Sequence, residues 1–207
     1  MAAVFVVRVW LPDRPGAFGA VASRIGAVRG DIVGIDILET GAGRAIDELV
    51  VSLPSDDLVP LLVKEIQEVE GVDVEDVRPV QGDLPDARVA ALESAAELLA
   101  QPSSDAVCKA LVEHVVRDFE AEWAGVLRDG VLVAANGETP SADWIGAFVS
   151  GSDGAGAIVS GPDDIAWAPL GPSGALVIGR QGRPFRARER RQLNALARII
   201  AWRISTS

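Results

Sequence analysis

The sequence predicts an α+β protein in two parts, and three observations support this fold class. Segments with apolar residues at every second position, typical of strands, alternate with segments in which apolar residues recur every three or four positions, as on one face of a helix. Over residues 1–80 these segments follow the order strand, helix, strand, strand, helix, strand. The stretch 81–86 (QGDLPD) has the composition of a linker, so residues 87–207 are predicted to form a second domain.

The composition agrees with two folded domains. The chain has 207 residues, 49% of them hydrophobic, which is enough apolar surface to offset the conformational entropy of folding. The net charge is −11, with 14 acids and 7 bases in residues 1–80 and 16 acids and 12 bases in the remainder. No apolar run is long enough to cross a membrane, and Met1–Trp10 offers neither a basic leader nor a small-residue cleavage site, so we do not expect export. With Cys108 as the single cysteine, no internal disulfide forms, and we expect a cytoplasmic protein.

The first predicted strand, Val4–Trp10, is followed by a proline-containing loop over 11–16. A helix is predicted next, because apolar residues at three- and four-residue spacing share one face. These residues are Phe18, Val21, Ala22, Ile25 and Val28. Gly30 is predicted to end the helix. Two strands with alternating apolar residues then form a hairpin about a glycine turn at 41–43. The alternating residues are Val33, Ile35 and Ile37, then Leu49, Val51 and Leu53.

A second helix is predicted to begin at the N-cap Asp57, with Pro60 early in the helix, where its missing N–H costs little. Gly71 ends this helix, and 72–77 forms the last strand. The apolar face of the helix consists of Leu58, Leu62, Ile66 and Val69. The first domain is therefore a βαββαβ sandwich with two helices on one face of a sheet.

The second domain is predicted to contain two helices, two hairpins and a final helix. The first two helices span about 87–100 and 105–119, separated by Pro102 and the caps Ser103 and Ser104. The later elements are a hairpin of 123–127 and 131–135 about an Asp–Gly turn, a short helix capped by Ser141, a glycine-rich loop at 151–156, a hairpin of 165–170 and 175–179, and a helix from Ala187.

Two segments of the first domain carry a family resemblance. DRPGAFG (13–19) follows the first strand, and GDIVGI (30–35) begins the second. At this spacing within the βαββαβ order, residues 1–80 resemble the ACT domain family of small-molecule-binding regulatory modules. The resemblance implies a ferredoxin-like fold, regulation by an amino acid, and pairing of domains in a homodimer.

The second domain carries a different resemblance. WAPL (167–170), GALVIGR (174–180) and PF (184–185), followed by an arginine-rich final helix, make residues 87–207 similar to a GAF domain. This implies an antiparallel sheet with flanking helices. GAF domains bind cyclic nucleotides, tetrapyrroles or other small effectors, or simply dimerise, and the sequence does not select among these options.

The loop between the first strand and the first helix is the candidate ligand site. N–H groups around Gly16–Phe18 have no partner within the helix and lie at the positive end of its dipole, which favours a carboxylate. Gly16 permits close approach of a ligand, and Pro15 sets φ at the helix start. The predicted ligand-binding residues are Asp13, Arg14, Pro15, Gly16, Ala17, Phe18, Asp31 and Ile32, with Asp31 supplied by the same subunit or by a partner.

Asp13 and Asp31 stand where many amino-acid-binding ACT domains carry asparagine, and Leu11 stands where many carry a polar residue. An aspartate accepts hydrogen bonds from an ammonium group but donates none to a carboxylate. The identity of the ligand therefore stays open. A second interpretation needs no ligand: Pro15–Gly16 begins the helix, Asp13 caps it, and Asp31 is a turn residue.

No pattern in the sequence predicts catalysis, a metal or a cofactor. His114 lies six residues after Cys108, so on one helix the two side chains point about 240° apart and form no thiolate pair. We expect His114 at the helix surface or half-buried. Asp163 and Asp164 are typical of a turn rather than a metal site, and 151–156 lacks the spacing of a dinucleotide loop.

Eight arginines lie between Arg180 and Arg203, with Glu189 as the single acid among them. No aromatic platform or helix-turn-helix pattern accompanies them, so nucleic acid is not the expected partner. A solvated outer helix face is the favoured interpretation. A contact with the acidic first domain, within one chain or across a dimer, is the alternative.

These observations lead to one main hypothesis and one alternative. The main hypothesis is a non-enzymatic regulatory protein that senses a small molecule, expected to be an amino acid, and changes its domain or dimer arrangement on binding. The alternative is an adaptor that acts through its dimer and partner surfaces and has vestigial pockets. An enzyme is disfavoured by the single histidine and the missing motifs.

Overall fold

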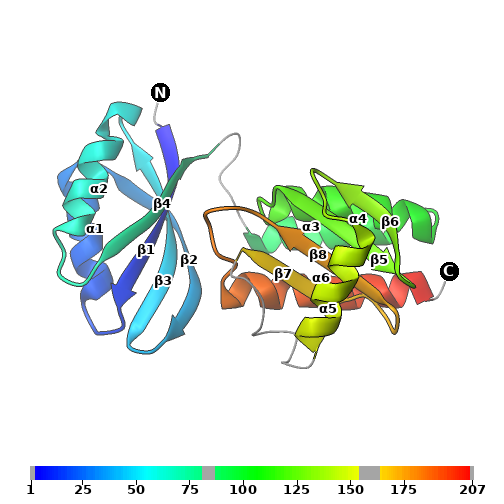
Figure 1. Cartoon of the computed structure of the whole chain (residues 1–207). Helices are drawn as coiled ribbons and strands as arrows, with labels where there is room; N and C mark the ends of the chain where they lie inside the picture. The colour runs from blue at the N-terminus through cyan, green and yellow to red at the C-terminus, as the bar shows by residue number, and fades with distance from the viewer. Residues whose placement is uncertain (1–2, 81–86, 154–163, 206–207) are drawn as a thin grey trace. The chain divides into compact units, whose positions relative to one another are not determined.

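A computed structural model describes residues 3–80, 87–153 and 164–205. The chain divides into two compact units, unit 1 (residues 1–85) and unit 2 (residues 86–207). Each unit contains its own four-stranded antiparallel sheet (Figure 1). The predicted linker 81–86 lies outside the described residues.

Unit 1 has the predicted βαββαβ order. Its elements are β1 (Ala3–Pro12), α1 (Ala17–Ala27), β2 (Asp31–Gly41), β3 (Arg44–Leu53), a 3-10 turn (Asp56–Leu58), α2 (Val59–Gln67) and β4 (Asp73–Pro79). The strands are arranged β2-β3-β1-β4, with all neighbours antiparallel. This arrangement confirms the predicted ferredoxin-like fold.

The core of unit 1 lies between the sheet and its two helices. Both helices lie on the same face of the sheet (Figure 1). Alternate residues of β1 and β3 face them, together with the apolar stripes predicted for the helices. The buried cluster consists of Phe5, Val7, Val9, Leu11, Val21, Ile25, Val28, Leu49, Val51, Leu53, Leu62, Ile66, Val69 and Val72.

The ends of α1 differ from the prediction. The helix begins at Ala17, and Gly16, rather than Asp13, is its N-cap, with φ of 87°. At the other end, Gly30 does not take the left-handed conformation; Arg29 does, with φ of 60°. Gly30 donates its backbone N–H to the carbonyl of Ile25 at 3.0 Å. A β-carbon added to Gly30 would lie only 2.9 Å from the side chain of Ile25. Close packing, not backbone conformation, therefore requires this glycine.

The limits of α2 also differ. A 3-10 turn over Asp56–Leu58 comes first, so Asp57 is not the N-cap of α2, and Pro60 lies in its first turn. The helix ends at Gln67, before Gly71, whose φ of 78° serves a later turn.

The sheet face of unit 1 that points away from the helices carries a network of charges. Arg8 is 1% exposed and donates from Nε and Nη2 to Glu48 at 3.0 and 2.8 Å. Arg78 donates to the same carboxylate at 2.7 Å, and Glu75 lies 3.7 Å from Arg8 Nη1. Trp10 donates its indole N–H to Glu75 at 2.6 Å.

Strand β2 forms one edge of the sheet and exposes apolar side chains. Val33, Ile35 and Ile37 are 42%, 49% and 56% exposed. The apolar side chains of β2 alternate as predicted, but they are exposed because β2 is the edge strand and extends beyond the layer of helices. An exposed apolar edge strand is a template for pairing with another chain.

Unit 2 contains a second antiparallel sheet. Its elements are α3 (Ala87–Leu99), α4 (Ser104–Asp118), β5 (Trp123–Arg128), β6 (Val131–Asn136), α5 (Ala142–Asp153), β7 (Ile165–Pro169), β8 (Gly174–Gly179) and α6 (Ala187–Ser205). The strand order is β6-β5-β8-β7. Residues 151–153 extend α5 instead of forming the predicted loop, and 154–156 lie outside the described residues.

Both faces of this sheet are packed by helices. The larger cluster joins α3, α4 and α6 to one face, with Leu111, Ile178 and Ile200 fully buried. On the other face α5 places Ile145 against Trp167 and neighbouring strand residues. An α+β unit with an antiparallel sheet and flanking helices is therefore confirmed, and the closer resemblance to a GAF domain stays a prediction.

Candidate functional site

The predicted ligand loop runs from the end of β1 to the first turn of α1. Asp13 donates its backbone N–H to the carbonyl of Gly43 at 2.9 Å, which ties the loop to the β2–β3 turn. Ala17 donates to the carbonyl of Arg14 at 3.3 Å, so the turn just before α1 uses the first of the expected donors. The N–H groups of Phe18 and Gly19 lie in the first helical turn, which offers no intrahelical acceptor, whereas Ala20 already donates to the carbonyl of Gly16 at 3.0 Å.

The side chains of this loop differ in exposure. Asp13, Arg14, Pro15 and Gly16 are exposed, whereas Ala17 is buried. Phe18 is half-buried against the core of unit 1. Pro15 lies in the turn before the N-cap rather than in the helix, which corrects its predicted role. Gly16 has a left-handed φ, and a β-carbon added to it would meet no atom within 4 Å, so the backbone at the helix start is open to a ligand.

Asp31 and Ile32 lie at the opposite end of the sheet. Asp31 pairs with Ser52, whereas the loop begins at Pro12, which pairs with Arg44. Positions 44 and 52 are separated by roughly 26 Å along the strand. One subunit therefore cannot bring Asp31 to the loop, and the same-subunit version of the predicted site is wrong.

A different carboxylate, Asp47, lies on β3 in the half of the strand toward the loop end of the sheet. It lies three positions along β3 from Arg44, roughly 10 Å from the end of the sheet where the loop begins. Asp47 pairs with Val9 and Ile37, so it faces the helices, and it is 7% exposed. Its Oδ1 is buried, and none of the described residues donates a hydrogen bond to it. Burial raises the pKa of Asp47 above its ordinary value.

A buried carboxylate oxygen without a hydrogen-bond partner is costly, so its presence needs an explanation. The predicted site did not include this residue, although the sequence contains a signal for it. Asp47 continues the alternation of Leu49, Val51 and Leu53, and this pattern puts an acid at a core-facing position. A ligand ammonium group is the natural partner for such an acceptor.

The single histidine is also placed differently from the prediction. His114 is 8% exposed, so it is buried rather than superficial. Its Nδ1 lies 3.2 Å from Ser94 Oγ, and its Nε2 lies 3.2 Å from a carboxylate oxygen of Glu97. Ser94 is 1% exposed and donates to Asp118. A serine as buried as Ser94 cannot contact a substrate. The contacts of Ser94 and Glu97 with His114 and Asp118 instead hold α3 against α4.

Cys108 lies on the same helix and is also buried. Burial raises the pKa of its thiol, so the reactive thiolate form is disfavoured. Within residues 3–80, 87–153 and 164–205, three or more potential ligands never gather into a group that could hold a metal ion. Asp163 lies outside the described residues. No helix in the same ranges is both long and apolar enough to span a membrane.

The arginine-rich segment is only in part the solvated face that was expected, because Arg191 and Arg198 of α6 are exposed whereas other arginines are buried or paired. Arg180 is 3% exposed and donates to Glu189 and to the carbonyls of Phe119, Arg183 and Pro184. Further along, Arg203 donates to the carbonyl of Gln101 at 2.7 Å. Several of these guanidinium groups therefore stabilise unit 2 itself. A contact with unit 1 stays a prediction.

Three solved structures illustrate what the chain is similar to. The ACT domain from GTP pyrophosphokinase of Chlorobium tepidum is 18% identical, with 39% of this chain and 100% of that chain covered and a TM-score of 0.32. An uncharacterized protein from Thermotoga maritima is 20% identical, with coverage of 39% and 100% and a TM-score of 0.32. An ACT domain protein from Streptococcus pneumoniae is 17% identical, with coverage of 38% and 91% and a TM-score of 0.33.

No family model matches the chain, and no curated protein matches it. The ferredoxin-like fold of unit 1 accordingly rests on its own strand order and register.

Proposed function

We propose that the protein is a non-enzymatic regulator that binds a free amino acid at the loop end of unit 1. The observation that carries this proposal is Asp47, a buried carboxylate whose Oδ1 has no hydrogen-bond partner. Proteins retain destabilising polar groups mainly where function requires them. The ligand ammonium group is the partner that this carboxylate lacks.

The ligand carboxylate is bound at the start of α1. Gly16 exposes its backbone there, and the N–H groups of the first helical turn lie at the positive end of the helix dipole. The proposed site offers donors for the ligand carboxylate at the start of α1 and an acceptor for the ammonium group at Asp47, toward the same end of the sheet.

A second copy of the chain completes the proposed site. If the exposed edge of β2 pairs antiparallel with the same edge of a partner, the start of the partner strand lies beside Gly41, at the loop end of the sheet. The partner subunit then supplies the Asp31 and Ile32 that a single subunit holds too far away. Ligand binding in this arrangement favours the dimer over other states.

The same edge supports the alternative function, an adaptor with vestigial pockets. The exposed row of Val33, Ile35 and Ile37 is suited to pairing whether or not a ligand is present. The two functions differ in one respect: only the regulator needs Asp47 to remain a carboxylate. For unit 2 we propose a GAF-like module. For the whole chain we propose a cytoplasmic location.

The test is calorimetric titration of the full chain with each of the twenty amino acids. At least one is expected to bind, and Asp47→Asn should weaken this binding about ten-fold or more, because the charged acceptor for the ammonium group is lost. Asp57→Asn is the matched control, since that aspartate is exposed in the same unit. Absence of binding by all twenty, or equal binding by Asp47→Asn, would overturn the regulator in favour of the adaptor.

Dimerisation is tested separately by analytical ultracentrifugation. Ile35→Lys places a charge on an exposed residue at the middle of β2 and should produce monomers. Ile199→Lys is the control, because Ile199 is similarly exposed on α6. A parent chain that is monomeric at all concentrations would remove the shared site.

A further inference from the structure

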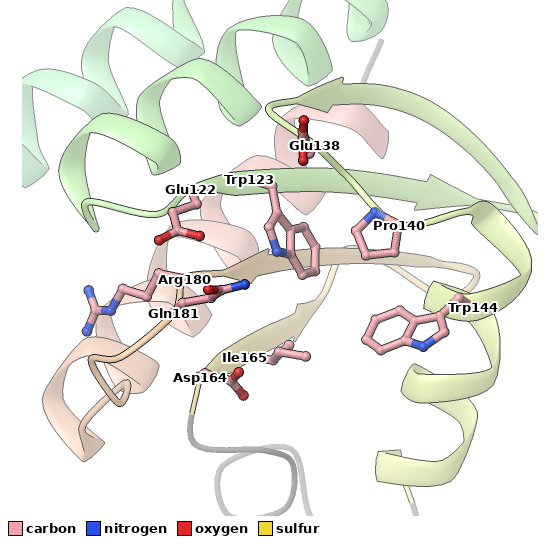
Figure 2. A pocket seen from close by; sticks show the side chains of 9 residues that line it. All are labelled: Glu122, Trp123, Glu138, Pro140, Trp144, Asp164, Ile165, Arg180 and Gln181. Atoms are coloured by element: carbon pink, nitrogen blue, oxygen red, sulfur yellow. The ribbon is translucent and has the colours of Figure 1, made fainter.

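Unit 2 contains a pocket of about 460 Å³, within the size range of small-molecule sites. It is lined from separate elements: the start of β5, the residues around the ends of β7 and β8, the β6–α5 connection and α5 (Figure 2). The residues that define its chemistry are Trp123, Trp144, Glu122, Glu138, Asp164 and Arg180.

Two indole rings contribute the aromatic wall. Trp123 and Trp144 meet edge to face, with centroids 6.5 Å apart and an interplanar angle of 81°. Figure 2 shows them projecting from β5 and α5 toward the same space. Trp123 lies so close over Gly179 that a β-carbon there would collide with its ring, and Trp144 stacks on Phe148 at 5.6 Å. Both rings are thus supported in place, while Trp144 remains 44% exposed.

The charged lining of the pocket is mainly negative. Glu122, Glu138 and Asp164 contribute three carboxylates. Arg180 lines the pocket, but its guanidinium is directed away and is neutralised by Glu189 at 2.6 Å (Figure 2). The carboxylates are not among the described groups that could gather around a metal ion. Dispersed negative charge in a pocket that also contains two indole rings attracts an organic cation rather than a metal ion.

We propose that this pocket binds a small organic cation, an ammonium group carried on an apolar body. The indole faces attract the positive charge through their quadrupoles and also cover the apolar body. The carboxylates contribute longer-range attraction. A phosphate-bearing ligand such as a cyclic nucleotide would instead meet three like charges. This selectivity is independent of the amino-acid site proposed for unit 1.

The test includes one pair of probes that differ in charge but not in shape, choline and 3,3-dimethylbutan-1-ol. Calorimetric titration of the full chain uses choline, its neutral isostere 3,3-dimethylbutan-1-ol, benzyltrimethylammonium and cyclic AMP. Choline is expected to bind about ten-fold more tightly than the neutral isostere, and benzyltrimethylammonium more tightly still. Saturable binding of neither cation, equal binding of the isostere, or tighter binding of cyclic AMP would overturn the proposal.

Variants assign the binding to this pocket. Trp144→Leu should weaken binding of benzyltrimethylammonium roughly five-fold or more, whereas Trp202→Leu, at an exposed tryptophan of α6, should leave it unchanged. Asp164→Asn should weaken binding about three-fold, and Asp129→Asn, in the β5–β6 turn, should not. Circular dichroism establishes folding, and Asp164→Asn keeps the test decisive if Trp144→Leu is misfolded. Unchanged affinity in folded Trp144→Leu, or in Asp164→Asn, contradicts the proposed site.

Discussion

The sheets of the two units differ in what lies on their second face. In unit 2, α5 packs Ile145 against that face, so apolar side chains bury both sides of the sheet. In unit 1, both helices lie on one side, and the other side carries Arg8 and its carboxylate partners. Two antiparallel sheets of equal strand number thus reach stability by different means. A charged residue within a strand can therefore be as buried as an apolar one when its partners lie on neighbouring strands.

The difference predicts that unit 1 depends most strongly on Arg8. Arg8→Ala removes the buried cation of the network and should destabilise unit 1 by about 3 kcal/mol, the low end for a broken buried pair, because Arg78 still pairs with Glu48. Denaturant unfolding combined with hydrogen exchange, which reports each unit separately, measures the effect. Arg24→Ala is the control, because the exposed Arg24–Glu65 pair should contribute less than about 1 kcal/mol. Equal effects of the two substitutions would contradict the role given to the network.

The corresponding substitution in unit 2 removes an apolar side chain. Ile145→Ala should destabilise unit 2 by about 2–4 kcal/mol, through lost burial and the cavity that remains. Hydrogen exchange should show the loss of protection in the sheet of unit 2 while that of unit 1 is unchanged. Ile199→Ala, at a position 41% exposed, should change stability far less. A similar loss in both variants would mean that α5 does not hold this face.

Substitution of one residue of unit 1, Asp47, should raise the stability of the unit rather than lower it. Asp47→Asn removes a buried, unpartnered charge, so we expect stability at pH 7 to rise by about 1 kcal/mol. Thermal and denaturant unfolding measure this gain, with Asp57→Asn as the exposed control. A loss of stability would show that the native carboxylate has a stabilising partner.

The smallest expected effect is a change in how the stability of unit 1 depends on pH in the acid range. Burial raises the pKa of Glu48, but Arg78 and Arg8 more than offset this and hold it below the ordinary 4.5. The contribution of Glu48 is thus fully present above pH 4.5 and is lost as the pH falls through its lower folded pKa. Asp47 acts oppositely, because its raised pKa gives a penalty that is relieved as the pH falls from that value toward 3.8.

Unfolding free energies measured between pH 7 and pH 3 test these signs. Glu48→Gln should reduce the acid-induced loss of stability, whereas Asp47→Asn should increase it, since the opposing relief disappears. The same direction of change in both variants would contradict the assignment.

Much of the fold could be predicted because local patterns and global packing agree. The stripe containing Val21 and Ile25 does face the core, and the Asp129–Gly130 turn does join β5 to β6. Helix ends are less predictable: Gly30 satisfies a packing contact, and Asp57 lies in a 3-10 turn. The packing at Gly30 involves Leu53 as well as Ile25, and Leu53 is distant in sequence.

The candidate site could be predicted less completely than the fold. A local motif identifies the loop residues around Gly16, whereas the register puts Asp31, predicted to join them, at the other end of the sheet. Burial of Arg8 and Asp47 depends on strand pairing, which periodicity alone does not specify. His114 is more buried than predicted because partners on α3 enclose it, and the sequence pattern does not reveal them.

The proposed regulator depends most on Asp47 as the acceptor for a ligand ammonium group. The most direct test is the affinity of the best-binding amino acid for the parent chain and for Asp47→Asn, measured by calorimetry together with unfolding stability. We expect a variant that is more stable and that binds about ten-fold more weakly or not at all. Unchanged affinity in a folded variant would contradict this role of Asp47.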